Sequence, residues 1–269
     1  MNEREMNHWR EEACARAFWD QHLALPYQEL LRHTASWLTP QPGEHWLDLG
    51  CGSGQLTGLL WRLSGGRLAE IVSLDCNPVN AEAIARVQGR LGEPATARIR
   101  FVTGDFSAGL PQFADGTFDG VVSGLAISYA EHRDPATGRY TDRAYDRLLA
   151  ELGRVLRPAG HLVFSVNVPE VRFWPILWKS LRRGRRLSKP FRALVNGLRM
   201  QAYGRWLQRE ARRRRFHYLP VEEIARRLER LGFVGFRYRL SYAEQAYLVQ
   251  ARRGGDQPPR AQVLASEAA

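Results

Sequence analysis

The sequence contains little cysteine and no long apolar run. Only 3 of its 269 residues are cysteines, without the pairing signals of a disulfide framework or the spacing of a zinc site. The N-terminus is polar and lacks the hydrophobic region of a secretory signal, and no later stretch has the apolar length that crossing a bilayer requires. No cluster of Asp, Glu or His has convincing metal-ligand spacing. We therefore expect a cytoplasmic protein of a reducing compartment, without a metal.

Acidic residues are also scarce relative to basic ones. The chain has 28 Asp and Glu against 39 Lys and Arg, a formal net charge of +11. Segment 171–215 holds fifteen Lys or Arg and a single acid, Glu210, so its local charge is +14 and the rest of the chain is slightly negative. Apolar residues recur at helical spacing between Phe191 and Trp206. The segment is therefore predicted to be a basic, amphipathic helical insertion.

The most informative motif follows the apolar run at residues 46–49. Glycines stand at the alternate positions Gly50, Gly52 and Gly54, directly before a helix-like segment. Glycine lets the backbone turn sharply and approach a ligand closely at a helix N-terminus. A dinucleotide-binding turn would need glycine at position 55, where the sequence has Gln55. The motif therefore predicts a nucleotide-type cofactor other than a dinucleotide.

Further apolar runs end in residues that suit such a cofactor. The run at 71–75 ends in Asp75, where an α/β fold places the acid that accepts hydrogen bonds from ribose hydroxyls. A third run ends in Asp105, and a fourth spans 118–125. Residues 148–164 then predict a helix, a Pro-Ala-Gly turn and a fifth strand. Alternating strands and helices predict a mostly parallel sheet with the cofactor at the carboxyl ends of its strands.

This pattern resembles the class I S-adenosylmethionine-dependent methyltransferases, in particular the methyltransferase type 11 group that includes ubiquinone and menaquinone methyltransferases. The resemblance rests on the motif Asp48-x-Gly50-x-Gly52-x-Gly54 and on the order of the apolar runs that follow it, which end in Asp75 and Asp105. It covers residues 40–168 and 216–252. S-adenosyl-L-methionine is therefore the expected cofactor. The resemblance implies a cofactor site made of Asp48, Gly50, Cys51, Gly52, Gly54, Asp75, Cys76, Asn77, Asp105, Phe106 and Ser123.

The expected roles of these residues differ. Asp105 and Phe106 would contact the adenine amino group and ring, and Asp75 the ribose. Asp48 would hold the methionine ammonium, directly or through water, or would only order the loop. Cys51 and Cys76 have no evident base partner, so we interpret them as small packing residues rather than nucleophiles.

The resemblance also implies an α/β architecture. We expect a Rossmann-like class I methyltransferase fold: a seven-stranded, mostly parallel sheet with an antiparallel C-terminal hairpin at 233–240 and 245–252, plus helical lid elements. Residues 1–39 would form an N-terminal helical lid of two helices separated near Pro26. Residues 40–252 would form the methyltransferase domain, with 171–215 as its insertion, and 253–269 a disordered tail.

Three interpretations of the basic insertion remain open. Its apolar face can pack on the core with the arginines in solvent. It can lie on an anionic membrane surface, giving access to a lipid or quinone and placing the protein at the inner face of the membrane. It can also bind nucleic acid through its arginines. The sequence carries no recognisable RNA-binding module and no Asn-Pro-Pro-Tyr or Asp-Pro-Pro-Tyr motif after the fourth strand, so the membrane is preferred over nucleic acid as the functional interpretation, beside simple packing on the core.

Methyl transfer from a sulfonium requires mainly alignment and exclusion of water. A general base is needed only where the acceptor must lose a proton. The catalytic candidates are His217 first, within Phe216-His217-Tyr218, and then Tyr129 and His132 beyond the fourth strand.

The sequence therefore predicts a methyltransferase for a small hydrophobic or membrane-associated acceptor, such as a lipid or a quinone. An RNA methyltransferase and a cofactor-binding protein without transfer activity are the alternatives. Carbon, oxygen and nitrogen methylation share the same cofactor frame, so the acceptor atom is left open, as is the oligomeric state.

Overall fold

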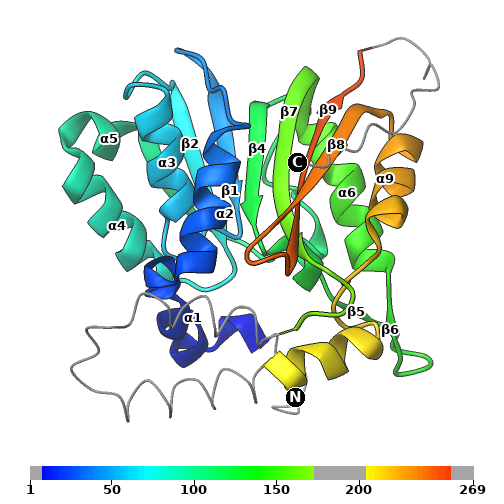
Figure 1. Ribbon diagram of the computed structural model, residues 1–269. Helices are drawn as coiled ribbons and strands as arrows, with labels where there is room; N and C mark the ends of the chain where they lie inside the picture. The colour runs from blue at the N-terminus through cyan, green and yellow to red at the C-terminus, as the bar shows by residue number, and fades with distance from the viewer. Residues whose placement is uncertain (1–7, 173–203, 256–269) are drawn as a thin grey trace.

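A seven-stranded sheet forms the centre of the protein, in the order β3-β2-β1-β4-β7-β9-β8 (Figure 1). The computed structural model describes residues 8–172 and 204–255. The strands of this sheet are β1 (His45–Leu49), β2 (Glu70–Asp75), β3 (Ile99–Thr103), β4 (Phe118–Gly124), β7 (Leu156–Asn167), β8 (Phe233–Ser241) and β9 (Ala246–Arg253). The first five pair in parallel, and β9 is antiparallel to both β7 and β8. The predicted sheet and its antiparallel hairpin are confirmed.

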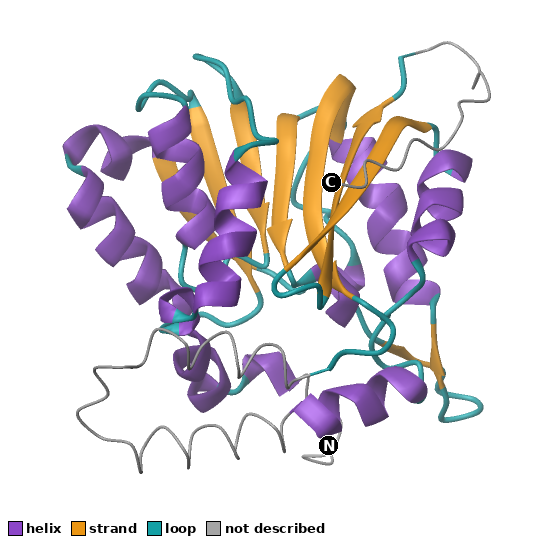
Figure 2. Cartoon of the chain, in the orientation of Figure 1, coloured by secondary structure: helices purple, strands orange, loops and turns teal. Residues whose placement is uncertain are grey.

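Helices cover both faces of this sheet (Figure 2). They are α1 (Glu12–Phe18), α2 (Leu25–Ala35), α3 (Gln55–Leu63), α4 (Asn80–Leu91), α5 (Glu93–Arg98), α6 (Arg143–Val155) and α9 (Val221–Arg230), with a further helix at 204–212. One apolar cluster joins α2, α3 and α4 to one face, through Leu30, Leu60 and Ile84. A second cluster joins α6 and α9 to the other face, through Leu148 and Ile224. The central parallel strands β1, β2 and β4 are thus covered on both sides, and most of their residues are buried, whereas β3 at the edge is partly exposed.

The N-terminal region contains two α-helices, as the sequence indicates. Pro26 does not lie between them but in the first turn of α2, where a missing N–H costs nothing. A short 3₁₀ segment, Gln21–Leu23, separates α1 from α2. In Figure 1, α1 lies beneath the carboxyl ends of the parallel strands.

The Pro-Ala-Gly sequence at 158–160 does not form a separate turn before the fifth strand. It lies inside β7 as an irregularity, because β4 pairs with Leu156 on one side of it and with His161 on the other. Ala159 adopts a left-handed φ of 64° there. Extra residues in one strand can be accommodated as a bulge without ending the ladder.

A two-stranded ribbon, β5 (His132–Arg133) with β6 (Tyr140–Thr141), follows β4 and was not anticipated. In the insertion, Leu207 of helix 204–212 is buried while Arg205, Arg209 and Arg212 are exposed. The remainder of the insertion, 173–203, and the tail from 256 lie outside the described residues. Among the described helices, none is long and apolar enough to span a membrane.

The contact between Trp46 and Gly120 gives a test of the core. These residues are partners on the adjacent strands β1 and β4, and a Cβ added at Gly120 would lie 2.5 Å from the Trp46 ring. We expect Gly120→Ala to lower the free energy of unfolding by about 1–3 kcal/mol, since the ring has no room to move. Gly89→Ala, within α4 and with open space around the added carbon, is the matched control and should raise it by about 0.5–1 kcal/mol. Urea unfolding of both variants measures the difference, and equal stabilities would contradict the packing argument.

Candidate functional site

The glycine loop is folded over the end of strand β2. The backbone N–H groups of Gly50 and Cys51 donate to the Leu74 carbonyl at 2.8 and 3.0 Å. The N–H of Gly52 donates to Oδ2 of Asp75 at 2.9 Å. The loop after β1 and the acid after β2 therefore form one unit at the carboxyl edge of the sheet.

The three glycines of the loop have different neighbours. All have positive φ, from 48° to 73°. A Cβ at Gly50 would lie 2.3 Å from the Ala126 side chain, and one at Gly54 would lie 2.7 Å from Ile84. A Cβ at Gly52 would meet nothing within 4 Å. Gly50 and Gly54 are therefore required by packing, whereas Gly52 borders open space.

Asp48 is almost fully buried, with 1% of its surface exposed. Its Oδ2 accepts hydrogen bonds from the N–H and hydroxyl of Thr57, at 2.8 and 2.7 Å, and so supports the first turn of α3. Its Oδ1 has no hydrogen-bond partner among the described residues. Burial raises the pKa of Asp48 to about 7, although the hydrogen bonds from Thr57 act in the opposite direction. A buried carboxylate with one oxygen unpaired suits a ligand that carries a cation.

Asp75 is held by backbone donors on both oxygens. Besides Gly52, the N–H of Asn77 donates to its Oδ1 at 2.9 Å. Burial raises the pKa of Asp75, against the hydrogen bonds from Asn77 and Gly52. Burial likewise raises the pKa of the neighbouring thiols of Cys51 and Cys76, which favours the neutral packing role expected for them.

Residues 9–11 contact the predicted cofactor residues directly. Arg10 pairs with Oδ2 of Asp105 at 3.1 Å, while Oδ1 of Asp105 accepts from the N–H of Ser107. The side-chain amide of Asn77 donates to the backbone carbonyls of Trp9 and Glu11, at 3.0 Å each. No local sequence pattern indicates these contacts, because they join positions 66 to 95 residues apart.

The other two predicted residues also lie at this edge. Phe106, buried, begins a 3₁₀ turn immediately after Asp105. The hydroxyl of Ser123 donates to the Leu49 carbonyl at 2.7 Å and so ties β4 to the end of β1. The structure therefore gathers the predicted cofactor residues from the ends of β1, β2, β3 and β4, and their binding role stays a prediction.

An aromatic wall adjoins this edge beyond β4. The Tyr129 ring lies 4.4 Å from that of Trp9 and stands perpendicular to that of Phe216 at 4.9 Å. The Tyr129 hydroxyl is 3.0 Å from that of Tyr218 and accepts from the amide of Asn167 at 3.3 Å. Asn167 is the last residue of β7, and sequence reasoning missed it. Burial raises the pKa of Tyr129 well above its usual value, and the Tyr218 hydroxyl adds to this.

His217 lies between Phe216 and Tyr218 in the chain, but its contacts differ from theirs. Its N–H donates to the Ser128 carbonyl at 2.8 Å, and its Nε2 lies 2.9 Å from the Ala130 carbonyl. Its ring stacks on Tyr145 at 4.7 Å. Among the described residues, no hydrogen bond or ring contact joins this imidazole to Tyr129 or to the glycine loop. The contacts favour a structural link between two loops over the expected general base.

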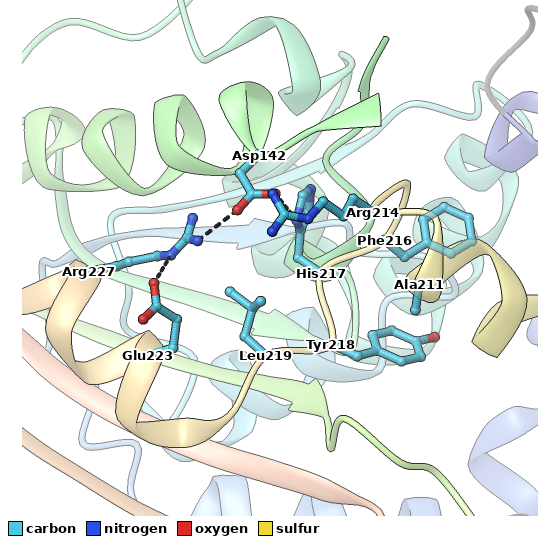
Figure 3. A pocket seen from close by; sticks show the side chains of 9 residues that line it. All are labelled: Asp142, Ala211, Arg214, Phe216, His217, Tyr218, Leu219, Glu223 and Arg227. Carbon is cyan, nitrogen blue, oxygen red and sulfur yellow. Dashed lines mark hydrogen bonds and ion pairs between the residues drawn. The ribbon is translucent and has the colours of Figure 1, made fainter. Parts of the chain in front are cut away.

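The far side of this loop borders a cavity of about 260 Å³ (Figure 3). In it His217 Nδ1 lies 3.7 Å from Asp142, which pairs with Arg227 at 2.8 Å, and Arg227 also pairs with Glu223. Burial lowers the pKa of His217, although Asp142 acts in the opposite direction. The remaining histidine candidate, His132, bonds to Thr141 across the β5–β6 ribbon at 2.7 Å.

Comparisons with known proteins agree with this geometry. Residues 47–164 match the family model of a methyltransferase domain. The chain is 29% identical over 197 residues to a malonyl-[acyl-carrier protein] O-methyltransferase of Methylococcus capsulatus, covering 71% of this chain and 62% of the relative. It is 38% identical over 117 residues to a demethylmenaquinone methyltransferase of Thermus thermophilus, covering 44% of each. The chain thus spans less than two thirds of the length of these relatives.

Among solved structures, an S-adenosylmethionine-dependent methyltransferase from Aquifex aeolicus has a similar fold. The TM-score is 0.55 at 15% identity, covering 90% of this chain and 98% of that one. The sheet order and the glycine loop, which contacts the acid at the end of β2, define a Rossmann-like fold. With the family match, they establish that the chain belongs to the class I S-adenosylmethionine-dependent methyltransferase superfamily.

The pKa of Asp48 leads to a prediction about cofactor affinity. The ammonium of S-adenosylhomocysteine favours the ionised carboxylate, so affinity should increase as the pH rises through about 7, with release of a proton on binding. Asp48→Asn should remove this dependence, and Asp115→Asn, at an exposed carboxylate, should preserve it. Calorimetry across this pH range tests both variants. An unchanged pH dependence in Asp48→Asn would refute the assignment.

A second prediction concerns His217 and stability. Because its pKa is lowered in the folded state, the unfolded chain binds more protons below the ordinary value of 6.5, so stability falls as the pH drops below that value. His217→Gln can still donate to the Ala130 carbonyl and should reduce this loss. The variant should not abolish the loss of stability at low pH, since burial also lowers the pKa of His8 and His161. Thermal unfolding across this pH range measures the slope, and an identical slope in the variant would contradict the prediction.

Proposed function

We propose that this protein transfers the methyl group of S-adenosylmethionine to a small acceptor with a hydrophobic body, such as a lipid or a quinone. The observation that carries the proposal is the proximity of two groups of residues. One is the glycine loop with Asp48 and Asp75, and the other is the aromatic wall of Trp9, Tyr129 and Phe216. Superfamily membership supports the first group as the cofactor site, and the apolar rings suit an acceptor of low polarity.

The proposed cofactor site follows from the contacts of each residue. Asp48 has a buried oxygen free for the methionine ammonium, and Asp75 lies where the ribose hydroxyls are expected. Asp105 and Phe106 would bind the adenine, beneath the residues 8–12 that cover them. The bound sulfonium supplies an electrophilic methyl group. The protein then contributes alignment of the acceptor and exclusion of water, which Trp9 and its neighbours favour by closing the edge.

We infer the class of acceptor from the names of the relatives and from the basic insertion. One relative is named for malonyl-[acyl-carrier protein] and another for demethylmenaquinone. In helix 204–212 the apolar side packs toward Phe216 and Tyr218, while arginines face outward beside the aromatic wall. A row of exposed guanidinium groups next to a hydrophobic acceptor site suits an acceptor drawn from an anionic membrane surface.

The test measures transfer of labelled methyl from S-adenosylmethionine to demethylmenaquinone presented in anionic vesicles. Malonyl-[acyl-carrier protein] and total RNA serve as competing acceptors. We expect transfer to the vesicle-borne quinone, decreasing with salt as the arginines are screened. Transfer to RNA alone would establish the alternative function, and cofactor binding without transfer to any of the three would contradict the proposal.

Asp75→Ala tests the proposed cofactor site. It should weaken binding of S-adenosylhomocysteine by roughly 10²-fold, because charge-assisted hydrogen bonds to the ribose are lost. Asp115→Ala is the control for removing a carboxylate elsewhere on the surface. If the wild type fails to bind S-adenosylhomocysteine, the cofactor assignment itself is wrong.

A further inference from the structure

The cavity beside His217 lies between the end of helix 204–212 and the start of α9 (Figure 3). Its lining comes from these two helices, from the connection 214–219 between them and from Asp142 before α6. It shares no residue with the glycine loop or with the strand ends that carry the predicted cofactor residues. The cavity is therefore separate from the proposed cofactor site.

Arg214 follows helix 204–212 in an unusual backbone conformation. Its N–H donates to the Ala211 carbonyl at 2.9 Å, and the N–H of Arg215 donates to the Glu210 carbonyl at 3.0 Å. This pair of hydrogen bonds is a Schellman motif, in which the position that Arg214 occupies is left-handed and is usually glycine. The φ of Arg214 is 61°. Residues held in such conformations gather at ligand sites, so an arginine here in place of glycine indicates a role for its side chain.

Among the described residues, the guanidinium of Arg214 has no hydrogen bond or ion pair, although it lines the cavity. On the α9 side, three carboxylates and three guanidinium groups pair with one another: Asp142, Asp146, Glu223, Arg226, Arg227 and Arg230. Asp142, the acid that the charge of Arg214 reaches, is thus already bound by Arg227 at 2.8 Å. Burial lowers the pKa of His217, so its imidazole adds no charge at pH 7. Arg214 is therefore the unbalanced charge of this cavity.

The rest of the lining indicates the kind of anion that fits. A guanidinium binds two oxygens of a phosphate at once, and the exposed arginines of helix 204–212 add positive potential nearby. Ala211, Phe216 and Leu219 give the cavity an apolar side, which suits a short hydrocarbon body. The volume of about 260 Å³ equals the share of roughly eight water molecules. A phosphate group joined to a small apolar body meets these conditions.

We propose that this cavity binds the phosphate monoester group of a second ligand, and that Arg214 is the residue that pairs with the phosphate oxygens. Phe216 and Leu219 cover the hydrocarbon that carries the phosphate. The site goes beyond the proposed methyl transfer and does not require the cofactor to be bound. A soluble phosphate ester and a lipid headgroup present the same group, and the experiments below separate these two sources.

The first experiment titrates phenyl phosphate into the full chain by calorimetry. The wild type should bind it, and Arg214→Gly should weaken binding about tenfold or more, because charge-assisted hydrogen bonds are lost. Arg212→Ala removes an exposed arginine that does not line the cavity and should weaken binding less than about twofold. Since glycine suits the left-handed position, Arg214→Gly should raise the melting temperature, so that lost binding does not reflect unfolding. Equal losses in both variants, or no binding by the wild type, would overturn the proposal.

A second variant tests the apolar side of the cavity without a change of charge. Ala211→Leu places additional carbon atoms in the cavity, so it should weaken phenyl phosphate more than it weakens inorganic phosphate. Ala150→Leu, at an exposed position of α6, is the matched control and should leave both affinities unchanged. If Ala211→Leu binds phenyl phosphate as the wild type does, the ligand does not occupy this cavity.

Vesicles of phosphatidylcholine, with and without phosphatidic acid, identify the source of the phosphate. Sedimentation with phosphatidic acid that is lost in Arg214→Gly but kept in Arg212→Ala would identify a lipid headgroup. Binding of phenyl phosphate without binding to these vesicles would identify a soluble ester. Vesicle binding that both variants lose equally would reflect general charge and would count against the lipid source.

This proposal and the cofactor assignment fail in distinguishable ways. Repeating the phenyl phosphate titration with S-adenosylhomocysteine present should give the same affinity, because the two sites share no residue. Competition between the two compounds would place the probe in the cofactor site and refute the proposal. A wild type that binds phenyl phosphate but not S-adenosylhomocysteine would support the cavity site and refute only the cofactor assignment.

Discussion

The joint between strands β1 and β2 is the constraint on which the rest of the site depends. Gly50 and Cys51 donate to the carbonyl at the end of β2, and Gly52 donates to the side chain that follows it. Backbone groups that leave a strand must find partners, and here they find them on the neighbouring strand. This orients the N-terminus of α3 toward the edge of the sheet and places Asp48 beneath it.

The same edge unites segments that are far apart in the chain. Residues 8–12 cover the ends of β2 and β3, and the loops before α6 and α9 form the wall beyond β4. Trp9 contacts residues on both sides. Its backbone carbonyl accepts a hydrogen bond from the side-chain amide of Asn77, and its ring lies against that of Tyr129. One short segment therefore touches both the predicted cofactor residues and the aromatic wall.

Helix 204–212 of the basic insertion has a packed apolar side and an exposed side that carries arginines. Leu207 and Trp206 join an apolar cluster with Phe216 and Tyr218, while most of the neighbouring arginines remain in solvent. Arg215 is the exception, since it is paired with Glu131 and Glu210. In the described part of the insertion, the apolar face thus packs on the protein, as the simplest sequence interpretation has it. The side chains of Arg205, Arg209 and Arg212 are left exposed to solvent.

Local pattern and distant contact account for different parts of this structure. The strands, the hairpin and the glycine loop were predictable because each is encoded within a few residues: apolar runs, turn residues and alternation. The Pro-Ala-Gly bulge was not, because strand pairing on both sides decides whether such residues form a loop or remain in a ladder. Residue type and position in the chain made His217 the first catalytic candidate. The structure instead buries its ring against Tyr145 and joins the residue to two backbone carbonyls, contacts that favour a structural role.

By itself the sequence determined the sheet, its glycine loop and the superfamily, since these follow from short motifs in a required order. Only the tertiary structure decided which side chains share the edge: Arg10 with Asp105, Asn77 with the N-terminal backbone, and Asn167 with Tyr129. The physical reason is that such contacts depend on the positions of whole strands and loops. Positions 38 to 95 residues apart become neighbours only when the sheet has brought their elements together.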